Sequence, residues 1–501
     1  MTRLRRLAVA GTVAVLIATV GQLTTAASAV AADATTAVTV DRAHPFGRLP
    51  SDFVGLSYEM RELSANCTSG GCTGNFDAAQ GNLVALYRNL GRSNLRIAGN
   101  QLDRDTLWVP AGQQAPDPLP SWVADIVTPN DIVRLNQFLK QVGWKSEVGI
   151  NMAHYDPALA ADEAHTLFSV LGSRLSGAEC GNEPNHYASN GYRPSPYGFA
   201  EHRADWEACA DVVGSTRIAA PDLSSPNGTI ATWFDRFAQA EHSRVNMMTL
   251  HNYTGATTVT QLLSPQIHDS ELSVVAPELA SAKAVGLPIR MDETNSAVGG
   301  GVLGVSDVYA SALWAFDYNM VMAQAGFAGL NFHGGFGICD GPLFNGKFQR
   351  YTPICAANQA DLDAKVYSAA PEYYGLYMAT QMGSGEFLPI TVTSDHNVTA
   401  YAVRGDDGRT RIAVIEKDPV GGAPVPVSLD LGRANGNASV IHLTGQSLDT
   451  AAGVAVQGAA VDRGGRLNPG RADRLKVRHG TATVSVATGS AVIITLDSDC
   501  D

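Results

Sequence analysis

Residues 129–181 of this 501-residue chain read PNDIVRLNQFLKQVGWKSEVGINMAHYDPALAADEAHTLFSVLGSRLSGAECG, and they are the best guide to its architecture. Two segments with apolar residues at helical spacing, 129–142 and 161–171, alternate with two short runs of mostly apolar or small residues, 146–151 and 177–181. Short apolar runs that alternate with helices are typical of parallel strands joined by crossover helices. The segment therefore predicts two consecutive strand and helix units of a parallel sheet.

The same alternation continues on both sides of this segment. Further helices are predicted at 82–90, 197–210 and 305–325. The candidate strands lie at 53–57, 95–98, 146–151, 177–181, 217–220, 247–251, 288–292 and 329–332. Eight strands, each followed by a helix or a long loop, are what a (β/α)8 TIM barrel needs. A doubly wound open sheet is the alternative, but no glycine-rich phosphate loop follows the first strand.

The sequence changes in character near residue 383. Segments 398–404, 410–417, 425–429 and 482–496 alternate or are rich in β-branched residues, with Gly, Asn and Asp between them. This pattern predicts an antiparallel β-sandwich. We therefore divide the chain into a barrel at residues 47–378 and a C-terminal β-sandwich domain at residues 379–501.

The first residues have the pattern of an export signal. Arg3, Arg5 and Arg6 precede an apolar run at 7–20, and small residues follow at 27–31. A run of about 14 residues is short for a membrane span, which needs roughly 20. We expect a signal peptide at residues 1–31 and a secreted, extracellular mature protein without a membrane partner; a membrane anchor is the alternative.

The composition excludes several classes of protein. Lys and Arg number 35 against 48 Asp and Glu, which makes the formal net charge −13. An acidic balance disfavours nucleic acid as a partner. Hydrophobic residues make up 45% and charged residues 17% of the chain, which is typical of a globular rather than a disordered protein.

Seven cysteines in an exported chain suggest disulfides. The candidate pairs are Cys67 with Cys72, Cys180 with Cys209, and Cys339 with Cys355, which leaves Cys500 over. Alternatively, Cys180 beside its strand is simply buried. No CxxC or HxxxH spacing occurs, so we expect no metal site.

Acidic residues stand where two predicted strands end. The fourth strand ends in Cys180-Gly181-Asn182-Glu183-Pro184-Asn185 and the seventh in Met291-Asp292-Glu293-Thr294-Asn295-Ser296. Each motif places a glutamate at the C-terminal mouth of the barrel, where barrel enzymes keep their active sites. One such glutamate alone is more often an ion-pair partner or a helix cap. Two facing carboxylates are what glycoside cleavage requires, and the pair therefore predicts a glycosidase.

These motifs resemble those of glycoside hydrolase family 79, which contains the β-glucuronidases and heparanase-like enzymes of the clan A barrels. The resemblance rests on GNEPN at 181–185 and ETNSAVGGG at 293–301, together with LRIAGN at 95–100, HNY at 251–253 and PEYYG at 371–375. It implies a retaining mechanism without a metal or cofactor, in which Glu183 is the acid/base and Glu293 the nucleophile. It also implies that a strand from residues 34–46 joins the C-terminal sandwich.

Polar residues near the other predicted strand ends are candidates for binding the sugar. We expect Asn182 to donate to a hydroxyl beside the anomeric carbon and Tyr253 to hydrogen-bond Glu293. The alternatives are structural roles: a strand-end hydrogen bond for Asn182, a core tyrosine for Tyr253, a satisfied histidine for His333 and loop polarity for the others. The candidate substrate-binding residues are Glu59, Asn100, Asn182, Tyr253, Gly299, Gly300, His333 and Tyr351.

One position departs from the family pattern. Family members that bind glucuronate often carry a tyrosine before the glycines that follow the nucleophile, where this chain has Val298. The amides of Gly299 and Gly300 remain as a backbone anion nest, and Lys347 and Arg350 lie in the loop after the eighth strand.

We therefore predict a secreted retaining, exo-acting β-D-glucuronidase. Its expected substrate is a glycan or glycoside that carries terminal glucuronic or 4-O-methylglucuronic acid. The alternatives are a clan A glycosidase for a neutral sugar, such as a β-xylosidase, and a non-catalytic carbohydrate-binding protein.

Overall fold

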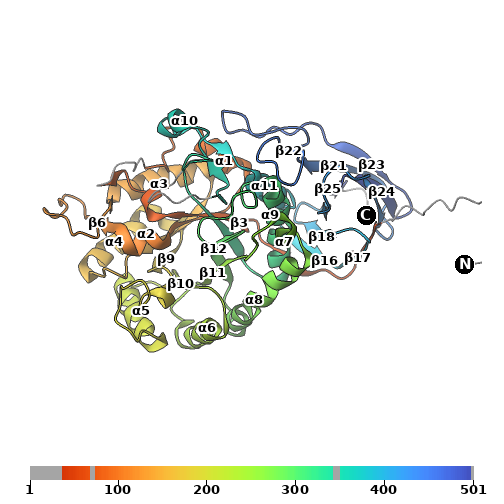
Figure 1. The fold of residues 1–501 in the computed structure, drawn as a ribbon. Coiled ribbons are helices and arrows are strands. Elements are labelled where there is room, and N and C mark those ends of the chain that lie inside the picture. The colour runs from red at the N-terminus through yellow and green to blue at the C-terminus, as the bar shows by residue number, and fades with distance from the viewer. Residues whose placement is uncertain (1–35, 68–73, 342–349, 498–501) are drawn as a thin grey trace, which may run out of the picture. The chain divides into compact units, whose positions relative to one another are not determined.

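Eight parallel strands close into a barrel in the computed structural model of the chain (Figure 1). The structure describes residues 36–67, 74–341 and 350–497, so the expected signal peptide, the partner Cys72, Cys500 and Lys347 lie outside the described residues. The barrel strands are β3 (Val54–Glu59), β5 (Asn94–Ala98), β8 (Lys145–Ile150), β9 (Leu175–Cys180), β10 (Ile218–Ser224), β11 (Met247–Tyr253), β12 (Ile289–Asn295) and β13 (Gly329–Gly334). The predicted TIM barrel is confirmed. Most positions of these strands are buried, as expected where helices cover the outer face of a parallel sheet.

The helices that surround the barrel begin and end at local signals. Helix α3 (Pro129–Val142) begins after Thr128, whose capping box with Asp131 satisfies free amides of the first turn, and ends at Gly143 in the left-handed region. The predicted helix 305–325 begins only at Tyr309, because the preceding residue is extended. The other main helices are α1 (Leu83–Asn89), α4 (Pro157–Leu171), α5 (Phe199–Val213), α6 (Gly228–Glu241), α8 (Pro265–Ala284), α9 (Tyr309–Ala325) and α11 (Pro371–Gln381).

Short elements complete the loops of the barrel. They are the helices α2 (Gly99–Asp105), α7 (Val259–Leu262) and α10 (Gln359–Asp363), the 3-10 helices η1 (Met60–Glu62), η2 (Gly172–Arg174) and η3 (Pro184–His186), and the strands β4 (Asn66–Cys67), β6 (Thr106–Trp108), β7 (Asp125–Val127), β14 (Ile354–Cys355) and β15 (Ser368–Ala369). Among the described residues, no helix has the length and apolar character of a membrane span.

The C-terminal domain consists of two sheets. One has the order β17-β1-β20-β24, and the other has the order β2-β16-β18-β19-β25-β21-β22, with β23 paired to β21. The strands are β1 (Thr36–Val40), β2 (Phe46–Leu49), β16 (Gly385–Leu388), β17 (Ile390–Thr393), β18 (Val398–Gly405), β19 (Thr410–Glu416), β20 (Val425–Asp430), β21 (Gly436–Thr444), β22 (Ala455–Val456), β23 (Asp473–Val477), β24 (Thr481–Val486) and β25 (Ser490–Leu496). Nearly all of their pairings are antiparallel, so the predicted β domain is confirmed, although β1 runs parallel to β20.

The N-terminal segment enters both sheets of this domain. Strand β1 lies within the expected segment 34–46, and β2 pairs with β16. The predicted β-rich segment 482–496 contains β24 and β25, which lie in different sheets because the chain turns before Ser490, with Gly489 at φ 63°. Strands β21 and β23 were not predicted from the sequence, because polar residues interrupt their alternation.

A continuous hydrophobic core joins the barrel to the sandwich. Helices α9 and α11 pack closely, and residues of the sandwich such as Tyr401 and Ile415 belong to the same buried cluster as the barrel. The Tyr309 hydroxyl donates to the Leu443 carbonyl across this boundary at 3.1 Å. The two domains are therefore packed together within one compact unit that begins at Thr35.

Two of the predicted disulfides are present. Cys180 at the end of β9 is bonded to Cys209 in α5, and Cys339 is bonded to Cys355. The alternative that Cys180 is buried without a partner is therefore wrong.

Candidate active site

Glu183 and Glu293 face each other at the C-terminal mouth of the barrel. Strand β9 ends at Cys180, and Gly181 follows with φ 78°, where an added Cβ atom would clash with the Tyr187 hydroxyl. Glu183 itself lies in the left-handed region (φ 49°, ψ 55°), an uncommon conformation for a residue other than glycine, and its amide donates to the Asp222 carbonyl at 3.1 Å. One carboxylate oxygen of Glu183 and one of Glu293 lie within 4.8 Å of each other.

The carboxylate of Glu293 is held as an anion. Arg96 Nη1 donates to Oε2 at 2.7 Å and the Tyr253 hydroxyl donates to Oε1 at 2.7 Å, while His333 Nδ1 lies 3.7 Å from Oε2. Burial raises the pKa of Glu293, but the charges of His333, His251 and Arg96 and the Tyr253 hydrogen bond outweigh it. The net pKa lies well below the usual range. The environment therefore favours an ionised Glu293.

Arg96 connects the C-terminal ends of β9 and β12. Its guanidinium is fully buried, and besides Glu293 it donates from Nε to Glu179 Oε2 at 2.9 Å and from Nη2 to Asn182 Oδ1 at 2.8 Å. Arg96 lies in one of the motifs shared with the family, but no role was predicted for it from the sequence. The available signal was a charged residue inside an otherwise apolar predicted strand, which needs a buried partner of opposite charge.

Glu183 has a different environment from Glu293. Its side chain is 15% exposed against 4% for Glu293, and its Oε1 contacts His251 Nδ1 at 3.0 Å. The other ring nitrogen of His251 lies 3.5 Å from Asp292 Oδ1. Burial and the Arg96 charge lower the pKa of His251, but Asp292 and Glu293 raise it more, to about 10. No role was predicted for His251 or Asp292 from the sequence.

Below the site, the barrel interior is unusually acidic. Glu147, Glu179, Asp222 and Asp292 are at most 1% exposed. Burial raises the pKa of Glu179 to about 8 and that of Glu147 to about 7, although nearby arginine charges lower both. Several of these oxygens and the histidine nitrogens lie within 4.8 Å of one another, as in a metal site, but Arg96 is already a counter-ion for Glu179 and Asp292.

The structure brings Asn182, Asn100, Glu59 and His333 to the same mouth. Asn182 Oδ1 accepts from Arg96, and its Nδ2 lies 3.3 Å from Asn100 Oδ1. Glu59 Oε2 accepts from the Gln101 amide at 2.7 Å. Its Oε1 lies 3.7 Å from His333 Nε2. The four side chains thus have protein partners that orient them around the carboxylate pair.

The glycines that follow Glu293 lie beside Tyr351. Gly299 and Gly300 have φ of 70° and 97°, and the Arg350 amide donates to the Gly300 carbonyl at 2.5 Å. The ring of Tyr351 lies 5.8 Å from that of Tyr253, between centroids. Tyr351 therefore lies beside Tyr253, which donates to Glu293, and the glycine segment adjoins Tyr351.

Val298 and the candidate partner Arg350 are placed less favourably for contact with a substrate carboxylate. The Val298 side chain is 67% exposed. The Arg350 guanidinium donates to the Cys339 carbonyl at 3.4 Å and lies within 4.0 Å of both Asp307 and Asp340. Its charge is therefore already balanced by protein carboxylates.

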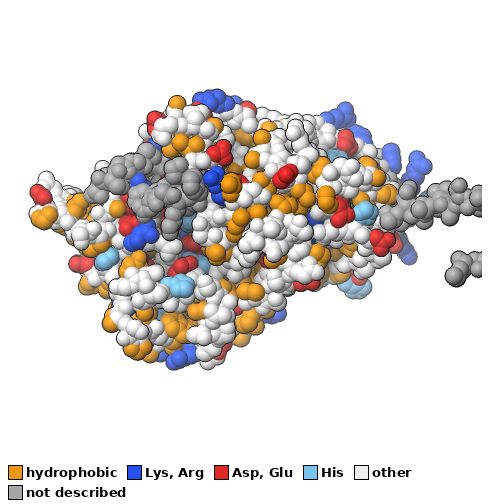
Figure 2. Space-filling view, in the orientation of Figure 1, with side chains coloured by type: hydrophobic (Ala, Val, Ile, Leu, Met, Phe, Trp, Pro, Cys, Tyr) orange, Lys and Arg blue, Asp and Glu red, His pale blue; other side chains and the backbone are white. Residues whose placement is uncertain are grey.

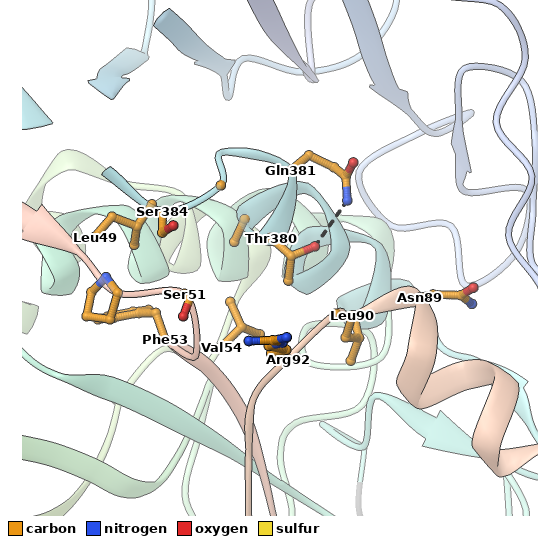
Figure 3. A pocket seen from close by; sticks show the side chains of 14 residues that line it. Leu49, Ser51, Phe53, Val54, Asn89, Leu90, Arg92, Thr380, Gln381 and Ser384 are labelled. Atoms are coloured by element: carbon orange, nitrogen blue, oxygen red, sulfur yellow. Dashed lines mark hydrogen bonds between the residues drawn. The ribbon is translucent and has the colours of Figure 1, made fainter. Parts of the chain in front are cut away.

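Neither the surface seen in Figure 2 nor a second cavity offers an alternative candidate for the active site. On the face in Figure 2, Lys and Arg side chains are scattered, and acidic and histidine side chains lie in the hollowed barrel surface. A cavity of about 260 Å³ lies at the opposite end of the barrel, between Val54, Arg92 and Gln381 (Figure 3). None of the described residues that line it is acidic, so it lacks the carboxylates of the mouth.

Comparison with known proteins points to one family. The model of the "Glycosyl hydrolase family 79 C-terminal beta domain" matches residues 400–493. A β-glucuronidase of Aspergillus niger is 24% identical over 279 residues, 49% of this chain and 48% of that protein. A β-glucuronidase of Neurospora crassa is 24% identical over 292 residues, with the same two shares. The chain thus matches about half the length of these curated relatives.

Solved structures support the fold. A 4-O-α-L-rhamnosyl-β-D-glucuronidase from Fusarium oxysporum superposes with a TM-score of 0.74 at 20% identity, covering 92% of this chain and all of that one. A family 51 arabinofuranosidase from Xanthomonas axonopodis pv. citri superposes with a TM-score of 0.66 at 14% identity, covering 93% of this chain and all of that one. In its C-terminal domain, its curated relatives and its two-domain fold, the chain is similar to proteins of glycoside hydrolase family 79.

Proposed function

We propose that this protein is a retaining β-glycosidase that removes terminal glucuronic acid or 4-O-methylglucuronic acid from a glycan or glycoside. The observation that carries the proposal is the pair Glu183 and Glu293, whose nearest oxygens lie within 4.8 Å at the barrel mouth. Retaining enzymes have carboxyl groups about 5–5.5 Å apart, whereas inverting enzymes need about 6.5–9.5 Å to admit a water molecule. The short distance between the carboxylates of Glu183 and Glu293 favours a mechanism that retains the configuration of the anomeric carbon.

The two environments suit the two roles of a double displacement. Glu293, held as an anion by Arg96 and Tyr253, attacks the anomeric carbon, and the bond to the leaving oxygen breaks as Glu183 protonates that oxygen. The product of this step is a glycosyl ester on Glu293. Glu183 then removes a proton from water, the water oxygen attacks the same carbon, and Glu293 is released as a carboxylate.

The sugar specificity is supported by the relatives and by local donors. Both curated relatives are named β-glucuronidases. The Tyr351 ring packs beside Tyr253, which donates to Glu293, and the glycine segment 299–301 lies against residues 350 and 351. The glycine amides and the Tyr351 hydroxyl are therefore the nearby hydrogen-bond donors that we propose for a uronate. A neutral-sugar glycosidase, such as a β-xylosidase, is the second candidate, because Val298 carries no hydroxyl and Arg350 already faces Asp307 and Asp340.

A substrate panel tests the proposal. We expect the wild-type protein to hydrolyse an aryl β-glucuronide with higher kcat/KM than the matched aryl β-xyloside. The opposite preference would favour the second candidate, and no hydrolysis of any aryl glycoside would contradict the enzymatic role.

Two variants assign the carboxylates. Glu293→Gln removes the nucleophile and should abolish turnover of every substrate. Glu183→Ala should spare the first step for substrates with good leaving groups, and azide should partly restore its turnover by replacing the missing base. Equal loss on activated and unactivated substrates without azide rescue would remove Glu183 from the acid/base role.

We also propose that the protein is exported and acts outside the cell. The support is the basic and apolar pattern of residues 1–31. N-terminal sequencing of protein from the culture medium tests it, with an expected start near residue 32. Retention of the full chain in the cell would contradict export.

A further inference from the structure

Behind Glu183, a histidine connects the carboxyl group to a buried pair of aspartates. His251 Nδ1 lies 3.0 Å from Glu183 Oε1, and His251 Nε2 lies 3.5 Å from Asp292 Oδ1. One oxygen each of Asp222 and Asp292 lies with a nitrogen of His251 in a group whose atoms are within 4.8 Å of one another. All three side chains are at most 1% exposed. The acid/base carboxyl is thus the outer end of a connected buried chain.

The two contacts of His251 restrict its protonation. A neutral imidazole donates from only one ring nitrogen and presents a lone pair at the other. When both Glu183 and Asp292 are ionised, a neutral ring would direct that lone pair at one carboxylate. An imidazolium instead directs an N–H at each, in a 3.0 Å contact with Glu183 and a longer 3.5 Å ion-pair contact with Asp292. The titratable groups facing the ring are Glu183, Asp222, Asp292, Glu293 and Arg96. Only Arg96 among them disfavours the cation.

Asp292 is ionised because the neighbouring carboxyl group of Asp222 keeps its proton. Two adjacent buried carboxyl groups do not both ionise readily, so one of them keeps a proton. Burial raises the pKa of Asp222 well above its ordinary value. Burial also raises the pKa of Asp292, but the charges of His251 and Arg96 outweigh it, and the net shift is downward. Asp222 is therefore the acid of the pair and Asp292 the anion.

We propose that Asp292 is a positioning residue for Glu183. Asp292 holds His251 as a cation, and this cation donates to the acid/base carboxylate of Glu183. Asp222 is the carboxylic acid that keeps Asp292 ionised. This inference rests on the proposed glycosidase function. Its use arises in the second step, when Glu293 is esterified and has lost its charge. The His251 cation then favours the ionised Glu183 that must act as base.

The direction in which the pH profile of kcat/KM shifts in Asp292→Asn tests the proposed role of Asp292. The basic limb reports the loss of the acid's proton. In Asp292→Asn the cation at His251 loses its counter-charge and becomes neutral, so Glu183 keeps its proton to higher pH. A charge this close shifts such a limb by about one to three pH units, and we expect an upward shift of at least about one.

A direct effect of Asp292 on Glu183 predicts the opposite sign. Removal of a negative charge alone would make Glu183 lose its proton more easily, and the basic limb would move down. A downward shift would therefore overturn the inference. His251→Gln should move the basic limb to higher pH. The double variant that also carries Asp292→Asn should show no further upward shift of this limb, because Asp292 acts through His251.

A matched control distinguishes a specific effect of Asp292 from the general effect of removing a buried carboxylate. Glu278 in α8 is also fully buried, and its carboxylate has no hydrogen-bond partner among the described residues. Glu278→Gln should leave the basic limb where it is in the wild type. A shift equal to that of Asp292→Asn would contradict a specific role for Asp292.

A spectroscopic measurement decides the inference without any substrate. In protein labelled with ¹⁵N-histidine, with His251→Gln used for assignment, we expect both ring nitrogens of His251 to be protonated at pH 7.5 in the wild type and a neutral ring in Asp292→Asn. A neutral wild-type ring overturns the inference, even if Asp292→Asn does not fold. A stoichiometric divalent ion in the purified protein would also overturn it, because the ion would replace the shared proton. If the wild type hydrolyses no glycoside while the ring behaves as expected, the proposed function alone fails.

Discussion

Glu183 and Glu293 are the same chemical group in two different surroundings. Glu293 receives hydrogen bonds from Arg96 and Tyr253 and is nearly buried. Glu183 is more exposed, and His251 is the ionisable side chain that contacts its carboxylate. In the proposed mechanism that difference, rather than the glutamates themselves, separates the nucleophile from the acid/base residue.

Tyr253→Phe tests the orientation and charge of the nucleophile. The Tyr253 hydroxyl donates to Glu293 at 2.7 Å, and a hydrogen bond to a charged group contributes about 1.5–3 kcal/mol. We expect kcat to fall roughly ten- to hundredfold with little change in KM. Because this hydrogen bond helps to lower the pKa of Glu293, its loss should also move the acidic limb of the profile to higher pH.

Steady-state kinetics across pH check this expectation. Tyr155→Phe serves as the control, since the Tyr155 hydroxyl donates to the Ala208 carbonyl in an exposed part of the barrel surface. If Tyr253→Phe keeps the wild-type acidic limb while kcat falls, the hydroxyl orients Glu293 without contributing to its charge. If both kcat and the acidic limb match the control, the hydroxyl does not support the nucleophile at all.

Among the elements, helices α9 and α11 are brought together by a glycine. A Cβ atom added to Gly375 of α11 would clash with the carbonyl oxygen of Ala312 in α9. We expect Gly375→Ala to force the two helices apart and to lower the free energy of unfolding by about 1–3 kcal/mol, as overpacking does.

Urea unfolding of Gly375→Ala measures this loss. Gly228→Ala is the matched control, because Gly228 begins α6 and no described atom lies within 4 Å of a Cβ added there. A Gly375 variant as stable as this control would show that the two helices have room to separate without cost.

Helix α9 is also joined to the sandwich by a buried ion pair. Asp317 Oδ2 accepts from Lys417 Nζ at 2.6 Å, and Oδ1 accepts from the hydroxyls of Thr399 and Tyr401 at 2.7 Å each. Burial raises the pKa of Asp317, but Lys417 and these hydrogen bonds lower it more, so the net shift is downward.

Asp317→Asn should destabilise the protein in a pH-dependent way. Breaking a buried ion pair costs about 3–5 kcal/mol. Because the folded pKa of Asp317 is lowered, its contribution is full above about pH 4, the ordinary value for an unfolded Asp, and is lost as pH falls through the lower folded pKa. Unfolding from pH 7 to pH 3 should show the variant approaching the wild type only at the acid end.

Asp395→Asn is the control for this series, since Asp395 is exposed and is not among the residues that contact Asp317. It should unfold like the wild type at every pH. A destabilisation of Asp317→Asn that is the same at pH 3 and pH 7 would show that the carboxylate charge is not what joins α9 to the sandwich.

In the molecule as a whole, the barrel and the sandwich share one core. The buried cluster that fills the barrel continues through α9 and α11 into the sandwich, and β1 and β2 from the N-terminal segment pair within the sandwich sheets. The barrel alone would therefore expose a large apolar face and two unpaired strands.

Truncation near Gly383 should give an insoluble or unstable barrel. We expect little soluble protein, and strong binding of a hydrophobic dye by any that remains. A chain that lacks only residues 1–31 serves as the control and should stay soluble. A soluble truncated protein with full activity would show that the two domains are independent.

The order of the elements and the pair of glutamates could be predicted from local sequence patterns. Strands and helices repeat with a local period, so the eight barrel strands were located within a few residues. Glu183 and Glu293 were identifiable because parallel strands end at one mouth, which brings residues far apart in the chain to one place.

The electrostatics of the site became visible only in three dimensions. Arg96 contacts Glu293 across 197 residues of sequence and Glu179 across 83, and no local period connects such positions. Because they also depend on contacts between distant segments, the pairing of β2 with β16 and the division of residues 482–496 between two sheets were likewise not predictable from local patterns. Local patterns determine which segments become strands and helices, whereas the closure of the barrel determines which buried charges meet, because each charge must find its partner in space.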